Sequence, residues 1–364
     1  MNILHVEAST GWGGQEMRIL REAEGMRQRG HVIIFAVMKG GLLIEKAKAA
    51  GFVVYELNFY KKAWGITLFR LLRIFRKHAI DVINTHSSLD SWIGGVAARI
   101  ARKKIIRTRH LSTSIRPGLN SKILYGYLAD FVVTTCQETA SAICQSAGRS
   151  QTSCLSIATG IHPKAIAYET GAPETFRQQL GLLPGQLLVG TACFMRSWKG
   201  IDDFLLAANF LRDDERIRWV IIGGGHFDTY KRKADELRLE GIVHFTGHLE
   251  NPYAAIGALD LFALLSTANE GVSQAILQAA YLQKPLIATS TGGLQEVCIP
   301  EETGIRVDKH APHQVVSAVL RLQSDPSTRH HLGQRAKQLV LERFTFDKML
   351  DQMEKAYQFI ERSL

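Results

Sequence analysis

Residues 259–282 read LDLFALLSTANEGVSQAILQAAYL, and this stretch indicates the fold. Leu259–Leu265 is an apolar run of strand length, and Ala275–Leu282 is an apolar run that continues as a helix. The turn between them holds an acid (Glu270), a glycine and a serine. The first N–H groups of a helix attract anions, and a carboxylate accepts hydrogen bonds from hydroxyl groups. A turn of this composition therefore suits a ligand that carries both phosphate and sugar hydroxyls.

The same strand-then-helix order recurs along the chain. Predicted strands of the first half are Ile3–Glu7, Val32–Val37, Val53–Leu57, Val82–Thr85, Lys104–Arg109 and Phe131–Thr135. Those of the second half are Leu187–Ala192, Trp219–Ile222, His244–Phe245, Leu261–Leu265 and Leu286–Ala288. Helical stretches, such as Ser121–Ala129, lie between them. Strands that alternate with helices predict βαβ units and parallel sheets, so the fold class is α/β.

The length of 364 residues favours two domains. We expect a first doubly wound domain over 1–165, a linker over 166–184, a second domain over 185–345, and a final helix over 346–364 that returns to the first domain. Ligands of such sheets bind beyond the carboxyl ends of the strands. Two facing sheets would then leave an interdomain cleft for the ligand.

Composition limits where the protein works. The chain has no apolar run of the length that a membrane span needs, and its first residues read as a strand rather than a signal peptide, which favours a cytoplasmic location. Its five cysteines form no C-x-x-C pair and are expected to be reduced. Residues 1–180 hold 24 Lys and Arg against 12 Asp and Glu, a net of +12, whereas the remainder has a net of −2. The first half therefore suits an anionic partner: a phospholipid surface, a phosphorylated glycolipid or nucleic acid.

A basic amphipathic segment spans residues 61–78. Arg70, Arg73 and Lys77 share one helical face, opposite an apolar face, and Trp64 and Phe69 have the size to enter a lipid headgroup layer. Two interpretations remain open. The segment is either a helix that lies on an anionic membrane surface or an ordinary helix packed on the sheet with a cationic outer face.

Two glycine-rich turns follow predicted strands. Gly13-Gly14 follows the first strand and opens a long helix, and Gly223 begins a three-glycine turn after the Trp219–Ile222 strand. Glycine lets the backbone approach a ligand closely, so these turns face either phosphate and nucleoside or nothing but the next element. No G-x-x-x-x-G-K-[ST] or G-x-G-x-x-G pattern occurs.

Charged groups follow other strands. Arg196 and Lys199 lie just beyond the Leu187–Ala192 strand, where two cations would neutralise a diphosphate, although a solvated basic turn is the alternative. His110 ends the Lys104–Arg109 strand, where a neutral imidazole would hydrogen-bond a sugar hydroxyl, or be purely structural. No metal-ligand spacing and no Gly-x-Ser-x-Gly nucleophile motif occurs, so we expect neither a metal site nor a serine hydrolase.

In this order, the motifs resemble those of glycosyltransferase family 4, a retaining family with the two-domain GT-B fold. The resemblance covers nearly the whole chain. It rests on these positions in chain order: Gly13-Gly14, His110, Arg196, Lys199-Gly200, Glu270 as the first acid of a Glu-x7-Glu signature, and Gly292-Gly293-Leu294-Gln295-Glu296. The sequence departs from the signature at Gln278, where the family has its second acid. A neutral amide accepts hydrogen bonds from ribose hydroxyls more weakly than a carboxylate does.

The resemblance implies transfer of a sugar from a nucleotide-diphosphate donor, as co-substrate and without a metal cofactor, to a saccharide or glycolipid acceptor. It implies catalytic roles for His110, Arg196, Lys199 and Glu270. Donor-binding roles fall to Gly13, Gly14, Gly223, Gly271, Val272, Ser273, Gln278 and Glu296. In this interpretation Arg196 and Lys199 stabilise the leaving diphosphate, Glu270 holds sugar hydroxyls, and His110 contacts the sugar from the other domain.

Within the family, the segments Trp12–Glu16, Thr85–Trp92 and Glu270–Gln274 resemble bacterial envelope-sugar enzymes, especially those of the lipopolysaccharide core. This favours a peripheral position at the inner face of the cytoplasmic membrane. Other interpretations are a nucleotide-sugar epimerase or hydrolase of the same architecture and a non-catalytic nucleotide-sugar-binding subunit. No nucleic-acid recognition motif is found, so no specific nucleic-acid partner is expected.

Overall fold

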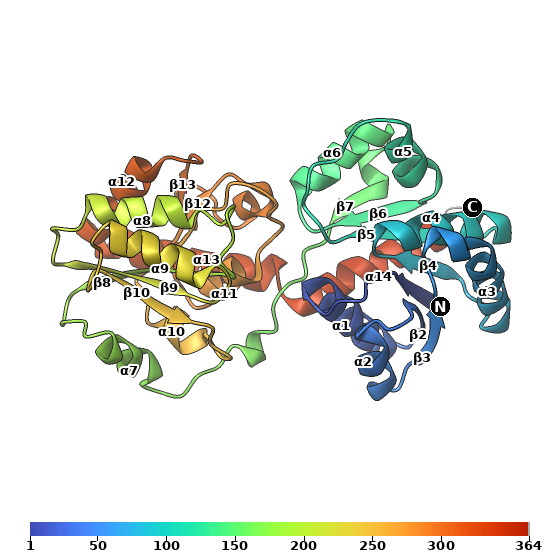
Figure 1. Ribbon diagram of the computed structural model, residues 1–364, viewed down its shortest axis with the longest axis horizontal. Coiled ribbons are helices and arrows are strands. Elements are labelled where there is room, and N and C mark those ends of the chain that lie inside the picture. The colour runs from blue at the N-terminus through green and yellow to red at the C-terminus, as the bar shows by residue number, and fades with distance from the viewer. Residues whose placement is uncertain (363–364) are drawn as a thin grey trace. The chain divides into compact units, whose positions relative to one another are not determined.

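The computed structural model describes residues 1–362 and contains two parallel sheets, each with helices on its faces (Figure 1). The first compact unit comprises Met1–Thr159 together with the C-terminal helix from Asp347 onward, and the second comprises Gly160–Phe346. The predicted α/β class, with one parallel sheet in each half, is confirmed.

The first unit holds a seven-stranded sheet in the order β3-β2-β1-β4-β5-β6-β7. Its strands are β1 (Asn2–Glu7), β2 (Val32–Met38), β3 (Val53–Leu57), β4 (Val82–Thr85), β5 (Lys104–Arg109), β6 (Phe131–Thr134) and β7 (Cys154–Ser156). All pairs are parallel, and His5 of β1 lies opposite Asn84 of β4 in register. The strand order reverses between β1 and β4. In doubly wound sheets, ligands commonly bind beyond the carboxyl ends of the strands at such a switch point.

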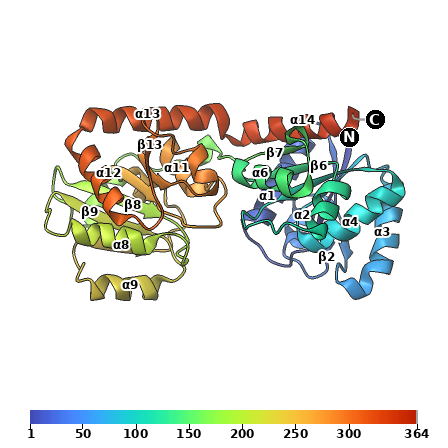
Figure 2. The ribbon, with the colours of Figure 1, turned by 90° about the horizontal axis from the view of Figure 1, so that it is seen from above.

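Helices cover both faces of this sheet. They are α1 (Gly14–Gln28), α2 (Leu43–Ala49), α3 (Trp64–Lys77), α4 (Ser88–Ala101), the short α5 (Leu119–Ser121), α6 (Gln137–Ala147) and α14 (Phe346–Arg362). Helix α14, red in Figure 2, packs on α1, where Gly25 leaves room for Leu350. Tyr357 of α14 donates to Glu22 of α1 and accepts from Asn84 of β4. Helices α3 and α4 pack on each other and on Leu4 and Val6, two apolar side chains of β1.

The second unit holds a six-stranded parallel sheet in the order β10-β9-β8-β11-β12-β13, with its switch point between β8 and β11. The strands are β8 (Leu187–Ala192), β9 (Ile217–Ile222), β10 (Val243–Gly247), β11 (Leu261–Leu264), β12 (Leu286–Thr289) and β13 (Gly304–Val307). The helices are α7 (Ala172–Gln179), α8 (Ile201–Phe210), α9 (Phe227–Glu236), α10 (Tyr253–Gly257), α11 (Gln274–Tyr281), α12 (Pro312–Ser324) and α13 (Pro326–Arg343).

Burial of the strands on both faces explains why their apolar sequences predict strands so clearly. Every residue of β8, β11 and β12 is buried, as expected for parallel strands covered on both faces. Trp219 of β9 is fully buried and meets Phe204 of α8 edge to face, with ring centroids 4.9 Å apart. Strand β1 differs, because His5 and Glu7 are also fully buried in it. Buried polar side chains need partners, so these two residues point to the polar site described below.

Some elements differ from the sequence prediction. Helices α6 and α13 and strands β7 and β13 were not predicted, since their apolar patterns are short or weak. The expected helix over 121–129 is instead a π-helical segment, Lys122–Tyr127, that follows α5. The expected linker over 166–184 belongs to the second unit and contains α7, whose Arg177 pairs with Asp260 at 2.9 Å. Within residues 1–362, none of the helices combines the length and the apolar character needed to cross a bilayer.

Candidate functional site

A buried ion pair lies at the switch point of the second sheet. Lys199, in the loop after β8, places its Nζ 2.9 Å from Oε1 and 2.7 Å from Oε2 of Glu270, in the loop after β11. The carboxylate side chain is 7% exposed and the ammonium side chain 16%. The structure therefore brings together one predicted cation and the predicted acid. Because both charges are largely removed from water, each depends on the other or on a charged ligand.

Glycines allow the backbone to pack directly against neighbouring backbone atoms in these two loops. Gly200 has a φ of +69°, and a Cβ there would lie 2.0 Å from the carbonyl oxygen of Leu265. Gly292 has a φ of +54°, and a Cβ there would lie 1.7 Å from the carbonyl oxygen of Glu270. The N–H of Gly293 donates to that same carbonyl at 3.1 Å. The Gly292-Gly293 pair thus supports the backbone of the Glu270 loop.

Gly223 is locked in a similar way after β9. Its φ is +129°, and a Cβ would lie 2.0 Å from the carbonyl oxygen of Cys193. Burial raises the pKa of the Cys193 thiol to about 12, while Lys199 lowers it and Glu270 raises it further. The close packing explains the glycine without a ligand. Contact of Gly223 with a nucleoside stays a prediction.

Arg196 takes a different position from Lys199, although only three residues separate them. Its side chain is exposed, and its guanidinium carbon lies 5.2 Å from the ring centroids of both Phe194 and Trp198. A cation held by two aromatic faces keeps its hydrogen-bond donors available at the ring edges. The structure therefore places Arg196 beside the site loop, on aromatic rings and not on the Glu270 carboxylate.

The remaining predicted donor-binding residues of this unit lie in the loop before α11, in α11 itself and in the turn after β12. Gly271 and Val272 lead to Ser273, which is the N-cap of α11 and has extended backbone angles. Gln278, one turn into the helix, is partly buried. Glu296 lies in a short 3₁₀ turn, Gly292–Glu296, after β12 and is also partly buried. The helix start supplies backbone N–H groups near the Lys199–Glu270 pair.

A second polar site lies at the switch point of the first sheet. Nδ1 of His5 lies 2.9 Å from Nε2 of His86, and Nδ1 of His86 lies 3.1 Å from Nε2 of the predicted His110. His5 and His86 are buried and His110 is partly exposed. Burial lowers the pKa of His5 to about 3, and it lowers the pKa of His86 and His110 well below the ordinary value. All three imidazoles are therefore neutral at pH 7.

Two buried acids flank these histidines. Glu7 accepts from the N–H of Ser9 at 2.6 Å, from Gln15 Nε2 at 2.6 Å and from the Ser87 hydroxyl. Burial raises the pKa of Glu7. Asp90 accepts from the N–H groups of Ser87 and His86, and burial, followed by the Glu7 charge, raises its pKa to about 8.

The predicted Gly13-Gly14 turn follows β1, the strand that ends in Glu7, and Gly13 is the N-cap of α1 with its N–H bonded to Glu16 at 2.8 Å. Sequence reasoning missed His5 and Glu7. The available signal was two polar residues inside an otherwise apolar strand.

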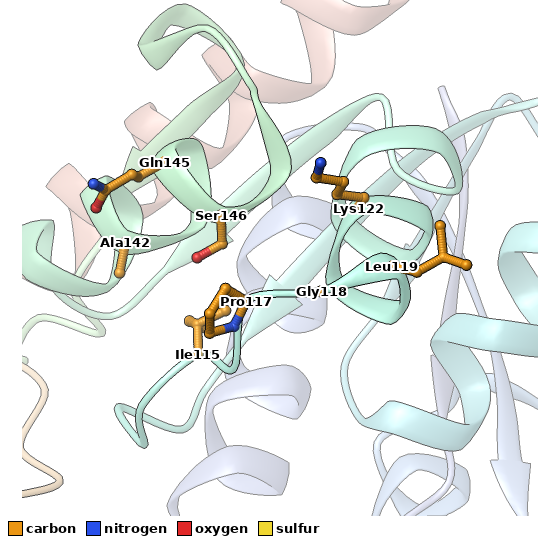
Figure 3. A pocket seen from close by; sticks show the side chains of 8 residues that line it. All are labelled: Ile115, Pro117, Gly118, Leu119, Lys122, Ala142, Gln145 and Ser146. Atoms are coloured by element: carbon orange, nitrogen blue, oxygen red, sulfur yellow. The ribbon is translucent and has the colours of Figure 1, made fainter.

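Two further observations help to delimit the candidate site. A hollow of about 710 Å³ lies between α6 and the segment around α5, and its lining includes Ile115, Pro117, Ala142 and Ser146 (Figure 3). None of the predicted site residues lines it. Among residues 1–362, no cluster of three or more His, Cys, Asp or Glu side chains is arranged to hold a metal ion.

Both halves of the chain match glycosyltransferase family models. Residues 12–164 match the model described as Glycosyltransferase Family 4, and residues 173–339 match the model described as Glycosyl transferases group 1. The chain therefore belongs to the glycosyltransferase families that these two models describe. The predicted family resemblance and the assignment as an enzyme are confirmed.

Curated relatives are distant. A D-inositol 3-phosphate glycosyltransferase of Corynebacterium glutamicum is 32% identical over 45% of this chain and 42% of its own length. An N-acetyl-alpha-D-glucosaminyl L-malate synthase of Bacillus anthracis is 22% identical over 79% of this chain and 77% of its own. The lipopolysaccharide core biosynthesis glycosyltransferase LpsD of Rhizobium meliloti is 26% identical over 36% of this chain and 38% of its own. The first relatives thus share less than half of their length with this chain.

Solved structures match the fold along the whole chain. A glycosyltransferase of Rickettsia africae has a TM-score of 0.88 at 18% identity and covers 100% of this chain and 99% of its own. HepE of Anabaena, solved in complex with UDP, has a TM-score of 0.84 at 20% identity and covers 99% of this chain and 100% of its own. Two Rossmann-like α/β domains of this kind constitute the GT-B fold, as predicted.

Proposed function

We propose that this glycosyltransferase moves a sugar from a nucleotide-diphosphate donor to a saccharide or glycolipid acceptor with retention of anomeric configuration. The observation that carries the proposal is the Lys199–Glu270 pair at the β8/β11 switch point. A partly buried cation and a buried acid, each in a loop that precedes a helix, match a diphosphate and sugar hydroxyls respectively. Relatives solved with UDP and UDP-glucose support a uridine nucleotide as the first donor to test.

Each residue would have a defined task in this proposal. Lys199 exchanges one contact with Glu270 for the diphosphate and stabilises its charge as the glycosidic bond breaks. Arg196 swings from the faces of Phe194 and Trp198 to the same diphosphate. Glu270 then accepts hydrogen bonds from sugar hydroxyls. The reaction needs no metal ion in this scheme, because the two cations take that role.

The acceptor proposed is a lipid-linked saccharide of the bacterial envelope, such as a lipopolysaccharide core. Support comes from the similarity to the LpsD protein and from the net charge of +12 over residues 1–180. On α3, Ile66 and Phe69 are 66% and 65% exposed, and Arg70 and Arg73 beside them are exposed too. We propose that this face rests on anionic lipid at the cytoplasmic side of the membrane.

Donor turnover tests the central assignment. We expect Arg196→Ala and Lys199→Met each to lower sugar transfer about a hundredfold or more, since each removes charge stabilisation from the leaving group. Arg216→Ala and Lys231→Ala are matched controls, because both side chains form exposed ion pairs in the same unit. Unchanged circular dichroism verifies folding. Near-normal turnover in both site variants would exclude the assigned diphosphate role.

The products decide between this proposal and the alternatives. Retention predicts that the new glycosidic bond has the anomeric configuration of the donor, as read by proton NMR of the product. Rapid donor breakdown or epimerisation without acceptor would instead indicate a hydrolase or an epimerase. Donor binding with no turnover, across a panel of phosphorylated saccharides and glycolipids, would indicate a non-catalytic subunit.

Vesicle sedimentation tests the membrane contact. We expect binding to phosphatidylglycerol vesicles but not to phosphatidylcholine vesicles, with loss of binding in Ile66→Ser combined with Phe69→Ser. Phe359→Ser is the control, since Phe359 is 48% exposed on α14. Equal binding of the double variant and the wild type would show that α3 is not the contact.

A further inference from the structure

The three histidines of the first unit form a continuous chain across neighbouring strands. His5 lies in β1, His86 follows β4, and His110 follows β5, and these strands are adjacent in the sheet. The rings contact one another through nitrogen atoms at 2.9 and 3.1 Å. The chain starts in the fully buried core and ends at a partly exposed ring beyond the carboxyl end of β5.

Neutral imidazoles restrict such a chain to two proton arrangements. A neutral ring has one N–H donor and one nitrogen lone pair, so each contact between rings needs a donor on one side and an acceptor on the other. Either all three protons are on Nδ1 or all three are on Nε2. A positive ring is disfavoured here by burial and by the nearby Arg18 and Arg107 guanidinium groups, both of which lower the pKa of His86 and His110.

The buried end of the chain distinguishes the two arrangements. His5 Nε2 is buried and has no hydrogen-bond partner among the described residues. A buried N–H without a partner is a rarer and costlier state than a buried lone pair without one. The arrangement with all protons on Nε2 would create that orphaned N–H. The arrangement with all protons on Nδ1 leaves only a bare lone pair at His5.

We propose that the chain carries its protons on Nδ1 throughout, so that His110 presents Nδ1–H as a fixed hydrogen-bond donor. His5 and His86 are then positioning residues that act through His110. This donor fits an oxygen acceptor on a ligand, such as a sugar hydroxyl, carbonyl or phosphate oxygen. His110 does not serve as a base at Nδ1, because that nitrogen already holds the proton. The ligand oxygen rests on the proposed function, whereas the proton order does not.

NMR of the full chain, labelled with ¹⁵N-histidine and without ligand, tests the proton order directly. Long-range proton–nitrogen correlations distinguish a protonated ring nitrogen from a bare one, and single variants at each position assign the signals. We expect bare Nε2 and protonated Nδ1 for His86 and His110 at both about pH 6 and about pH 8. The exposed His331 of α13 is the internal reference for an imidazole outside the histidine chain. Protonated Nε2, averaged tautomers or a charged ring at His110 would overturn the proposal.

A variant tests whether His86 sets the state of His110. His86→Phe removes the N–H that faces His110 Nε2, so His110 is expected to populate both tautomers. An unchanged His110 signature in that variant would show that His86 does not position it. Should the variant fail to fold, the wild-type spectrum alone still decides the proton order. Absent sugar transfer with the expected spectrum would count against the proposed function only.

Discussion

Substitution of Gly292 by alanine tests how the acid loop is held. The new Cβ would lie 1.7 Å from the Glu270 carbonyl oxygen, so the loop must move by about 1.3 Å to restore the 3.0 Å that real Cβ atoms respect. The left-handed φ of +54° adds about 1–2 kcal/mol for alanine. Overpacking against a backbone adds about 1–3 kcal/mol. We therefore expect a loss of about 2–5 kcal/mol in the free energy of unfolding, together with weakened donor binding because Glu270 is displaced.

The matched control is Gly181→Ala. Gly181 has a φ of +70°, but a Cβ added there would have no atom within 4 Å, so only the backbone cost of about 1–2 kcal/mol applies. Native-state hydrogen exchange of β8 and β11 peptides measures the opening free energy of the second unit by itself. Equal losses in the two variants would refute the reasoning, since the close contact at Gly292 would then carry no cost.

Three further predictions concern other residues. Gln278→Glu is expected to keep or tighten nucleoside diphosphate binding, because a carboxylate accepts ribose hydroxyls better than an amide; weaker calorimetric binding would contradict a ribose contact. Burial and the Glu7 charge raise the pKa of Asp90 in the folded chain to about 8, whereas Asp in an unfolded chain titrates near ~4. Between these two pH values the folded chain holds an extra proton. Its free energy of unfolding therefore falls as the pH rises from about 4 to about 8. Asp90→Asn should reduce the fall in unfolding free energy between about pH 5 and about pH 8, measured by urea titrations, because Glu7 then contributes the remainder alone; the same fall in the variant and the wild type would contradict the shift. Iodoacetamide should label Cys193 roughly a thousandfold more slowly than a free cysteine at about pH 8, because its pKa is raised to about 12. Peptide mass spectrometry follows the labelling, and rapid labelling would contradict the raised pKa.

The sequence predicted the two parallel sheets because their strands are buried on both faces. Nearly continuous apolar runs form β11 (Leu261–Leu264) and β8 (Leu187–Ala192), and such runs can be recognised in a sequence without tertiary information. Helix α13 was missed because its surface-exposed polar residues outnumber its buried ones. Helix α7, which lies between residues 166 and 184, was not predicted because its Arg177 is fixed by a contact with Asp260 that is distant in sequence.

The sequence indicated candidate site residues of the second unit only where a charged residue follows a predicted strand. Lys199 and Glu270 lie in loops that follow apolar strands, and the strand order of the sheet brings them together. The aromatic setting of Arg196 depends on side-chain packing, which the sequence does not specify. The histidine chain depends on the adjacency of β1, β4 and β5, and the strand order that creates it follows from chain crossovers and not from local pattern.

Hydrogen exchange with and without a nucleotide sugar tests the central claim, that the second unit binds the donor through the loops that hold Lys199 and Glu270. The full chain is compared alone and with UDP-, GDP- and ADP-linked sugars. We predict that one donor protects residues 193–200 and 266–274 and that Lys199→Met abolishes this protection. Protection confined to other segments, or protection that survives Lys199→Met unchanged, would contradict the account.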